Sequence, residues 1–396
     1  MKHLAPTTFR AFACAAGSCP DSCCRAGWEI VPDEETLKLY KTLPGLAGER
    51  VRAGIVSPDA FPLRGRWHRA SHASPMPDEV GSRESEKIIH SDDTAKTAEP
   101  EEPLLRQNDA RVCVLLDPDG LCHVQRNFGH EALCRVCREY PRFHREFGNL
   151  TEHGVSLSCP TAYALAVNAP LEWETWEDQA PVVPNELDPE AYLRLRRGRE
   201  LALELLAREE LPLQRRIELV RRLAASMQAA PEKRIHHDWA LRLRRWETGI
   251  RARQAGIRGR RQAAVGAVIG RPPDTCYLSA PDRLAERFAG LEILSPAWEE
   301  KLAQFRTRYK NGSDAQCALL QTDRPEVYAR YLAYSLYKYW LDALDDGNLA
   351  GRVARSVSMT LLGLAMDRAF PEEGPFLQRI SREIEHCEEN LAALLQ

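Results

Sequence analysis

Cysteine is the residue type in this chain whose number and spacing most directly predict chemistry. Nine of the twelve cysteines lie within the first 159 residues, in two sets and a singleton. The first set lies in the string CAAGSCPDSCC, the second in CVLLDPDGLCHVQRNFGHEALCRVC, and the singleton in SLSCP. Closely spaced thiols bind either a metal or one another. The nine candidate ligands are Cys14, Cys19, Cys23, Cys24, Cys113, Cys122, Cys134, Cys137 and Cys159.

The start of the sequence helps to decide between a metal and disulfides. Residues 1–13, MKHLAPTTFRAFA, lack the apolar segment of a signal peptide, and no apolar run has the length needed to cross a bilayer. We therefore expect a soluble, cytoplasmic protein with no membrane partner. Because stable disulfides are rare in a reducing cytosol, the cysteines favour a metal or iron–sulfur site over a disulfide framework.

The spacing of the thiols narrows the kind of metal site. Cys134 and Cys137 form the one standard C-x2-C pair, whereas a zinc ribbon needs two such pairs. Nine thiols also exceed one mononuclear site, so an iron–sulfur cluster with additional structural thiols, or two metal sites, fits the count better. In either case, ligands from the two cysteine sets must converge and join the two chain segments. The C-x3-C-x2-C motif of radical-SAM enzymes begins at Cys19 and Cys23 but fails at Ala26.

The length of 396 residues and the change in composition along the chain predict two domains. We expect a mainly α protein, in which a small cysteine-rich metal-cluster domain with short β elements precedes a helical C-terminal domain. The small domain is predicted in two halves, 1–63 and 104–165, and the helical domain covers 166–396. Residues 64–103 are polar, charged and aperiodic, which predicts a disordered insertion. Three histidines within it, His68, His72 and His90, are interpreted as exposed loop residues rather than ligands.

Local signals predict several elements of the small domain. Asp33 is a suitable helix N-cap, and the DPDG turn at Asp117–Gly120 suits a short hairpin. A helix over Leu133–Tyr140 should end before Pro141.

Apolar side chains at steps of three or four predict helices over 190–208, 326–344, 353–369 and 376–395, with a further helix beginning near Pro212. Cys387 lies on the last apolar stripe and is expected to be a buried apolar residue, and the isolated Cys276 and Cys317 receive the same interpretation.

Charge and aromatic patterns indicate function less directly than the cysteines do. Nineteen bases and eight acids between Arg194 and Arg261 favour solvated helix faces over an acidic partner, and no nucleic-acid-binding motif is visible. The segment EVYARYLAYSLYKYW supplies many aromatic faces, which either pack into a core or accept a cationic group. Trp28, near the paired cysteines, either shields a metal cluster from solvent or belongs to the core.

The order of motifs between Phe12 and Pro160 resembles that of the flagellin lysine-N-methylases. The opening F-x-C-x4-C-x3-CC-x2-GW, then C-x-LLD, GLC-x-VQ, FGHEALC, C-x2-C, YPR and SLSCP are similar to that family. The similarity covers roughly residues 9–165. A related group of small zinc- or iron-chelating domains shares the CC and YPR elements. The insertion at 64–103 departs from the compact family pattern.

The resemblance implies transfer of a methyl group from S-adenosylmethionine to lysine side chains of flagellin, the protein partner. It also implies a cysteine-bound 4Fe–4S cluster, with zinc as the alternative. Arg135, Arg138 and Arg142 are candidates for binding the methyl donor, and Tyr331 and Tyr334 are candidate catalytic residues. Two other functions remain open at this point: a non-catalytic, zinc-stapled protein-binding module, and a redox or electron-transfer protein.

Overall fold

The computed structural model of the chain describes residues 1–56, 102–181, 187–229, 281–309 and 322–395. Helices dominate these residues and the strands are few and short, which confirms the predicted mainly α fold class. Residues 64–101 of the predicted insertion lie outside the described residues, as do its three histidines, Cys276 and Cys317. None of the described helices combines the length and apolar character that crossing a bilayer requires.

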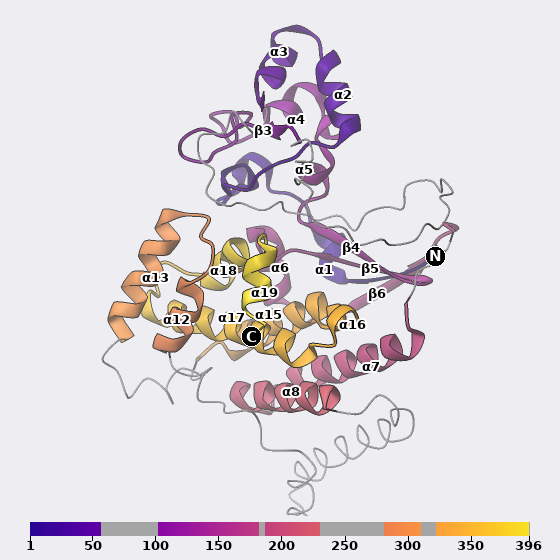
Figure 1. The fold of residues 1–396 in the computed structure, drawn as a ribbon, viewed down its shortest axis with the longest axis vertical. Coiled ribbons are helices and arrows are strands. Elements are labelled where there is room, and N and C mark those ends of the chain that lie inside the picture. The colour runs from indigo at the N-terminus through magenta and orange to yellow at the C-terminus, as the bar shows by residue number, and fades with distance from the viewer. Residues whose placement is uncertain (57–101, 182–186, 230–280, 310–321, 396) are drawn as a thin grey trace, which may run out of the picture.

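A small region built from short helices lies at one end of the molecule (Figure 1). Its elements are α2 (Glu34–Thr42), α3 (Gly45–Ala53), β2 (Ile55–Val56), β3 (Leu104–Leu105), α4 (His123–Phe128) and α5 (Arg135–Glu139). The predicted N-cap is confirmed, because the Asp33 carboxylate accepts the backbone N–H of Thr36 at 3.0 Å. Strands β2 and β3 pair antiparallel, so the two chain segments on either side of residues 57–101 lie side by side.

The predicted hairpin in this region forms only in part. The DPDG turn is present, since the Gly120 N–H donates to the Asp117 carbonyl at 2.9 Å and Gly120 adopts a φ of +84° that suits glycine. The flanking segments, however, share a single antiparallel bridge, between Leu116 and Cys122. The predicted hairpin is limited to this bridge because helix α4 begins at His123 and ends the pairing.

A four-stranded sheet, which the sequence analysis did not predict, joins the small region to the helices. Its strand order is β4-β5-β1-β6, with β1 parallel to β5 and the other pairs antiparallel. The register places Leu4 opposite both Glu152 and Thr175. The strands are β1 (Lys2–Pro6), β4 (Arg142–Phe147), β5 (Leu150–Val155) and β6 (Trp173–Glu177), and the short helix α1 (Thr7–Ala11) follows β1.

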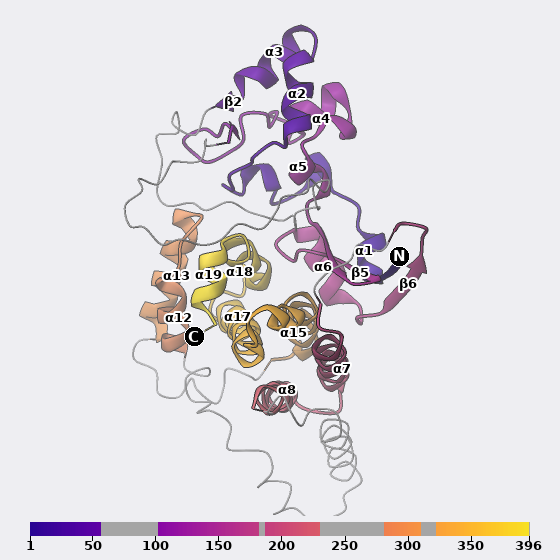
Figure 2. The same ribbon diagram turned by 45° about the vertical axis from the view of Figure 1, so that its right-hand side comes forward.

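Helices also form most of the rest of the molecule, and α17, with 21 residues, is the longest of those described (Figure 2). They are α6 (Pro160–Asn168), α7 (Pro189–Leu206), α8 (Leu213–Gln228), α12 (Pro281–Ala289), α13 (Pro296–Tyr309), α15 (Pro325–Tyr339), α16 (Ala343–Asp346), α17 (Leu349–Ala369), α18 (Phe376–Ile384) and α19 (Glu388–Ala393). Most predicted helices are confirmed within a few residues. The predicted helix over 376–395 is instead two helices, because the chain turns between Ile384 and Glu388.

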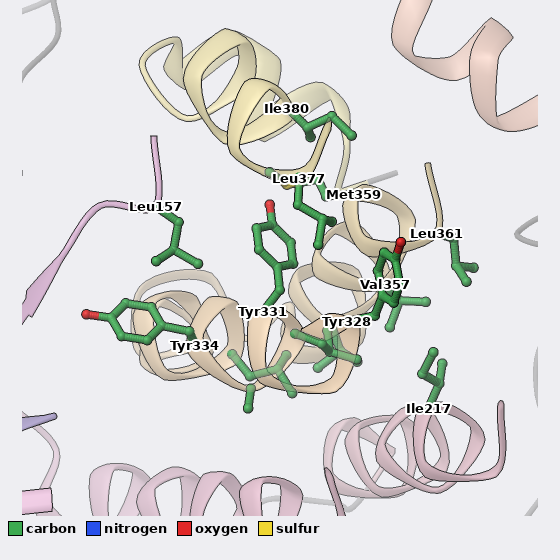
Figure 3. Close-up of a cluster of buried hydrophobic side chains, with 14 of the residues drawn as sticks. Leu157, Ile217, Tyr328, Tyr331, Tyr334, Val357, Met359, Leu361, Leu377 and Ile380 are labelled. Carbon is green, nitrogen blue, oxygen red and sulfur yellow. The ribbon is translucent and has the colours of Figure 1, made fainter. Parts of the chain in front are cut away.

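The buried apolar side chains form two separate cores. The large core combines α6, α7, α8, α15, α17 and α18 with residues of β5, and Figure 3 shows its centre. The small core lies among α2, α3, α4 and α5. Because Val155 and Leu157 belong to the large core, the hydrophobic contacts divide the chain before residue 165. The predicted domain boundaries themselves stay a prediction.

Candidate functional site

Cysteines from both sets line one enclosed cavity in the small region. The cavity has a volume of about 60 Å³, and aromatic rings of Trp28, Tyr40 and Tyr140 complete its wall together with His386. The cysteines that line it are Cys23, Cys24, Cys113, Cys122 and Cys137. Cysteines of the two sets therefore lie close together, and their role as ligands stays a prediction.

Backbone hydrogen bonds hold the two sets together. Ser22 caps the 3-10 turn Cys23–Arg25, because its hydroxyl accepts the Cys24 N–H at 3.3 Å. The Cys113 N–H in turn donates to the Cys24 carbonyl at 2.9 Å. The cysteine of the second set is thus fixed to the paired cysteines of the first by main-chain geometry, independently of any bound group.

Two pairs of neighbouring thiols differ in acidity within each pair. Cys23 donates a hydrogen bond to Cys24, which raises the pKa of Cys23 well above its usual range and lowers that of Cys24 to about 7. The C-x2-C pair behaves in the same way: a hydrogen bond from Cys137 lowers the pKa of Cys134, and the pKa of Cys137 is raised. The thiolate is the metal-binding form, and a bound metal would itself lower the pKa of every thiol that coordinates it.

The remaining candidate thiols do not line this cavity. Cys134 is fully buried beside Cys137. Cys14 is exposed, Cys19 is half-buried, and Cys159 is buried at the start of α6, in the large core. Cys14 and Cys159 are close enough to Cys23 to raise its pKa.

The donor set suits a soft metal or an iron–sulfur cluster, since thiolates are the usual ligands of both. In the described part of the chain, however, no three Cys, His, Asp or Glu side chains are arranged so that they could hold one metal ion. The type of the donor atoms thus fits a thiolate-bound group, while their arrangement does not single out a set of ligands.

The arginines proposed from the sequence lie outside the cysteine cavity. Arg135 is exposed at the start of α5, and Arg138 contacts the Glu131 carbonyl at 3.3 Å. Arg142 donates to the Phe12 carbonyl at 3.2 Å, and its guanidinium lies 5.0 Å from the centre of the Phe12 ring. Their role in binding a methyl donor stays a prediction, and Arg142 has an evident structural role in joining β4 to the segment after α1.

The two candidate tyrosines belong to the large core (Figure 3). The Tyr331 hydroxyl lies 2.8 Å from the Ser381 hydroxyl, and the Tyr334 hydroxyl accepts the Val155 N–H at 2.8 Å. Both rings are essentially inaccessible to solvent. The interpretation of this segment as a packed aromatic helix is confirmed, and a catalytic role for either tyrosine stays untested.

The prediction that Cys387 is a buried core residue was wrong. Its side chain is only half-buried, and its sulfur accepts the Asn390 N–H at 3.4 Å as the N-cap of α19. The apolar stripe of 376–395 suggested one continuous helix, and the turn before Glu388 removes Cys387 from that stripe.

A buried polar network, absent from the sequence predictions, connects the cavity wall to the large core. The Tyr140 hydroxyl lies 3.0 Å from that of Ser158, which lies 2.8 Å from that of Ser156. Ser156 donates to Glu385 at 3.3 Å, and Glu385 accepts from Lys338 at 2.7 Å. No local signal could have revealed this network, because Ser156 and Glu385 are 229 residues apart in the chain.

Helix α18 also holds the loop that carries the paired cysteines. Arg382 donates to the carbonyl of Asp21 at 3.1 Å and forms an ion pair with its carboxylate at 2.6 Å. Gln378 contacts the same carboxylate at 3.2 Å and the Ser158 carbonyl at 2.7 Å. The helical region therefore sets the position of the Cys23–Cys24 turn. We call these contacts of Gln378 and Arg382 the α18 clasp.

Part of the chain is similar to known proteins. The chain is 26% identical over 159 residues to the flagellar biosynthetic protein FliU of Salmonella muenchen, which covers 40% of the chain and 73% of that protein. It is 26% identical over 165 residues, 42% of the chain, to the lysine-N-methylase of Salmonella typhimurium, and a similar match is found with the lysine-N-methylase of Salmonella choleraesuis. The matched segment spans about a third of the length of these lysine-N-methylases. No family model and no solved structure matches the chain.

Proposed function

We propose that this chain is a protein lysine methyltransferase that transfers a methyl group from S-adenosylmethionine to lysine side chains of flagellin. One observation supports this most strongly: the cysteine motifs whose order resembles the flagellin lysine-N-methylases close on a single cavity. The similarity to proteins named lysine-N-methylase and flagellar biosynthetic protein supports the same activity. That similarity covers about two fifths of the chain. For the rest of the chain, the proposal rests on the geometry of the structure.

The proposed reaction is a displacement at a methyl carbon. The lysine amine must first lose a proton, since only its free electron pair can attack. The new N–C bond forms as the C–S bond of the sulfonium breaks, and the bonding electrons remain on sulfur as a neutral thioether. The methylated nitrogen is left as an ammonium cation, so each transfer releases one proton overall. Such a step needs in-line positioning of the two reactants more than strong acid catalysis.

We further propose that a subset of the nine N-terminal cysteines holds an iron–sulfur cluster of the 4Fe–4S type, with zinc as the alternative. Cys23, Cys24, Cys113, Cys122 and Cys137 are the first candidates because they line the cavity. A group bound there would join the two chain segments around residues 57–101 and would leave Trp28 and Tyr140 as its shield from solvent.

Methylation is tested by mass spectrometry of flagellin. Purified flagellin is incubated with the full-length chain and S-adenosylmethionine, and peptides are mapped for added methyl groups on lysine. The proposal predicts methyl additions that require both the chain and the donor. Unmodified flagellin after incubation with metal-replete, folded protein would refute the proposed activity.

The bound group is tested on anaerobically purified protein by metal analysis and visible absorption. Iron, sulfide and broad visible absorption support the cluster, whereas colourless protein with stoichiometric zinc refutes it. Cys137→Ala should lose metal, and Cys387→Ser, which keeps a helix-capping side chain, should retain it. Equal metal loss in both variants would contradict the assignment of the ligands to the N-terminal cysteines.

A further inference from the structure

A second cavity, much larger than the one lined by cysteines, lies between β6, α7 and α15. Its volume is about 460 Å³, against about 60 Å³ for the cysteine cavity, and the two share no lining residue. Pockets that bind nucleoside-sized molecules have volumes of roughly 300–1,000 Å³. Of these two cavities, only the second has room for such a molecule.

The wall of this cavity offers an aromatic face. Trp173, at the start of β6, is 39% exposed although it is a large apolar side chain. Its ring is held edge-on against Tyr337 of α15, with 4.7 Å between the ring centres. Leu4, Leu203 and Ala333 add apolar surface beside it. An exposed indole fixed in one orientation is suited to stacking a planar base or facing a cation.

Two of the charged groups that line the cavity are already committed to buried partners. Arg199 is bound through both terminal nitrogens to the carboxylate of Glu152. Glu326 is bound in the same manner by Arg216, at 2.9 and 2.6 Å. These groups form the floor of the cavity, and breaking either pair to bind a ligand would expose an unpaired buried charge.

Other charged groups that line the cavity have longer ion-pair contacts. Arg330, whose side chain is 23% exposed, lies 3.9 Å from Glu209 and also donates to the Val167 carbonyl at 3.2 Å. Arg196 lies 3.3 Å from Glu200, and Glu204, whose side chain is 55% exposed, lies 3.8 Å from Arg197. The exposed pairs of Glu200 and Glu204 contribute about 0–1 kcal/mol each, so a ligand can replace them at little cost. The rim therefore presents both positive and negative groups to a bound molecule.

We propose that this cavity binds the methyl donor, S-adenosylmethionine, and this inference rests on the proposed function. The donor carries a planar adenine, a sulfonium cation and an amino acid with charges of both signs. Trp173 supplies the face for the adenine or the sulfonium, Arg330 a partner for the carboxylate, and Glu204 a partner for the cationic groups. A substrate lysine alone would need carboxylates and an aromatic wall, but neither the arginines of the rim nor so large a volume.

The position of the donor bears on the role of the bound metal. If the donor occupies the cavity between β6, α7 and α15, the methyl group is delivered in the helical region, at a place whose lining includes no cysteine. The thiolate-bound group would then lie outside the lining of the cavity that holds the donor.

The test is equilibrium binding of S-adenosylmethionine and of S-adenosylhomocysteine to the full-length chain by calorimetry. Trp173→Ala should weaken binding about tenfold, since stacking on an aromatic ring contributes roughly 1–3 kcal/mol. Arg330→Gln and Glu204→Gln should each weaken it several-fold. Trp173→Phe keeps an aromatic ring, so its affinity should fall less than that of Trp173→Ala. This comparison separates loss of the stacking surface from loss of folding.

Trp176 provides the matched control. It lies on the same strand, three residues on, so it belongs to the opposite face of the sheet, where it stacks on His3 with 5.0 Å between the ring centres. Trp176→Ala should leave the affinity unchanged. Unchanged affinity in Trp173→Ala and Arg330→Gln would overturn the site while the methylase proposal stands. If the folded wild-type chain bound neither compound, the methyl donor itself would be wrong, and the site with it.

Discussion

The two cores of this protein differ in what holds them together. The small core combines side chains of helices of five to nine residues with side chains of the segments between them, and two of its buried members are cysteines. The large core draws on α7, α8, α15 and α17, which are 15 to 21 residues long, and it contains no thiol other than that of Cys159 among its buried members. Short helices bury little apolar surface. We infer that the small core depends on its thiols and their bound group, whereas the large core is stable through packing and buried ion pairs.

The largest expected effect is on the large core, from breaking the buried pair of Glu152 and Arg199. Both side chains are at most 4% exposed, and the Arg199 guanidinium also contacts the Tyr337 carbonyl at 3.2 Å. Glu152→Gln should lower the free energy of unfolding by about 3–5 kcal/mol, because it leaves a buried arginine without its counter-charge. Thermal unfolding measures this, with the exposed Glu146→Gln as a control expected to change stability by less than about 0.5 kcal/mol. A loss as small as that of the control would show that Arg199 is compensated in another way.

A cavity-forming substitution tests whether the two cores are independent. Leu115 in the small core is 1% exposed, and Leu362 in the large core is fully buried. Leu115→Ala should cost about 2–4 kcal/mol in the small region and reduce metal content, while Leu362→Ala should cost a similar amount without metal loss. Hydrogen exchange read out by peptide locates each effect. Equal metal loss in the two variants would mean that the cores unfold as one unit.

Acid should act first on the sheet between the two cores. His153 is buried between His3, at 2.8 Å, and His144, at 2.6 Å, with Asp178 in turn 3.0 Å from His3. Burial lowers the pKa of His153 to about 4. Since an unfolded histidine titrates near 6.5, the unfolded state binds more protons at this residue between these values, and the contribution of His153 to stability should fall by on the order of 1–3 kcal/mol as pH drops from 6.5 to 4. Burial raises the pKa of Glu383 to about 7, which acts in the opposite direction, so the contribution of His153 is the difference between the wild-type profile and that of His153→Gln.

This pH dependence is measured from unfolding midpoints across that range. His153→Gln should flatten the profile, whereas His130→Gln, at an exposed position of the small region, should preserve it. An unchanged slope in His153→Gln would assign the acid sensitivity to other groups.

The smallest expected effect concerns the α18 clasp, which links the two regions. Arg382→Gln removes the ion pair with Asp21, whose carboxylate is 37% exposed, and should cost about 1–2 kcal/mol. Because the clasp positions the Cys23–Cys24 turn, alkylation of these two cysteines should accelerate in metal-free protein while that of Cys134 does not. Arg379→Gln, on the exposed face of the same helix, is the control. Equal acceleration at Cys134 would indicate general loosening of the small region.

The sequence predicted secondary structure correctly where neighbouring residues determine it. Asp33 caps its helix as predicted, Pro141 follows the end of α5, and the aromatic segment after Pro325 forms a buried helix. The strands were missed, because each is short and its partners are distant in the chain: β1 pairs with β5 and β6, about 150 residues away or more. Cys387 was misplaced for a related reason, since an apolar stripe does not show where a helix breaks.

Residue types and spacing alone showed that thiols cluster in the first 159 residues and predicted that long amphipathic helices follow. Tertiary structure decided which thiols share a cavity, that helix α18 holds the paired cysteines, and that a separate large cavity forms beside Trp173. This difference arises from the range of the interactions along the chain. Helix caps, turns and apolar periodicity act over a few residues, whereas a cavity or a buried polar network depends on elements hundreds of residues apart that meet only in the folded chain.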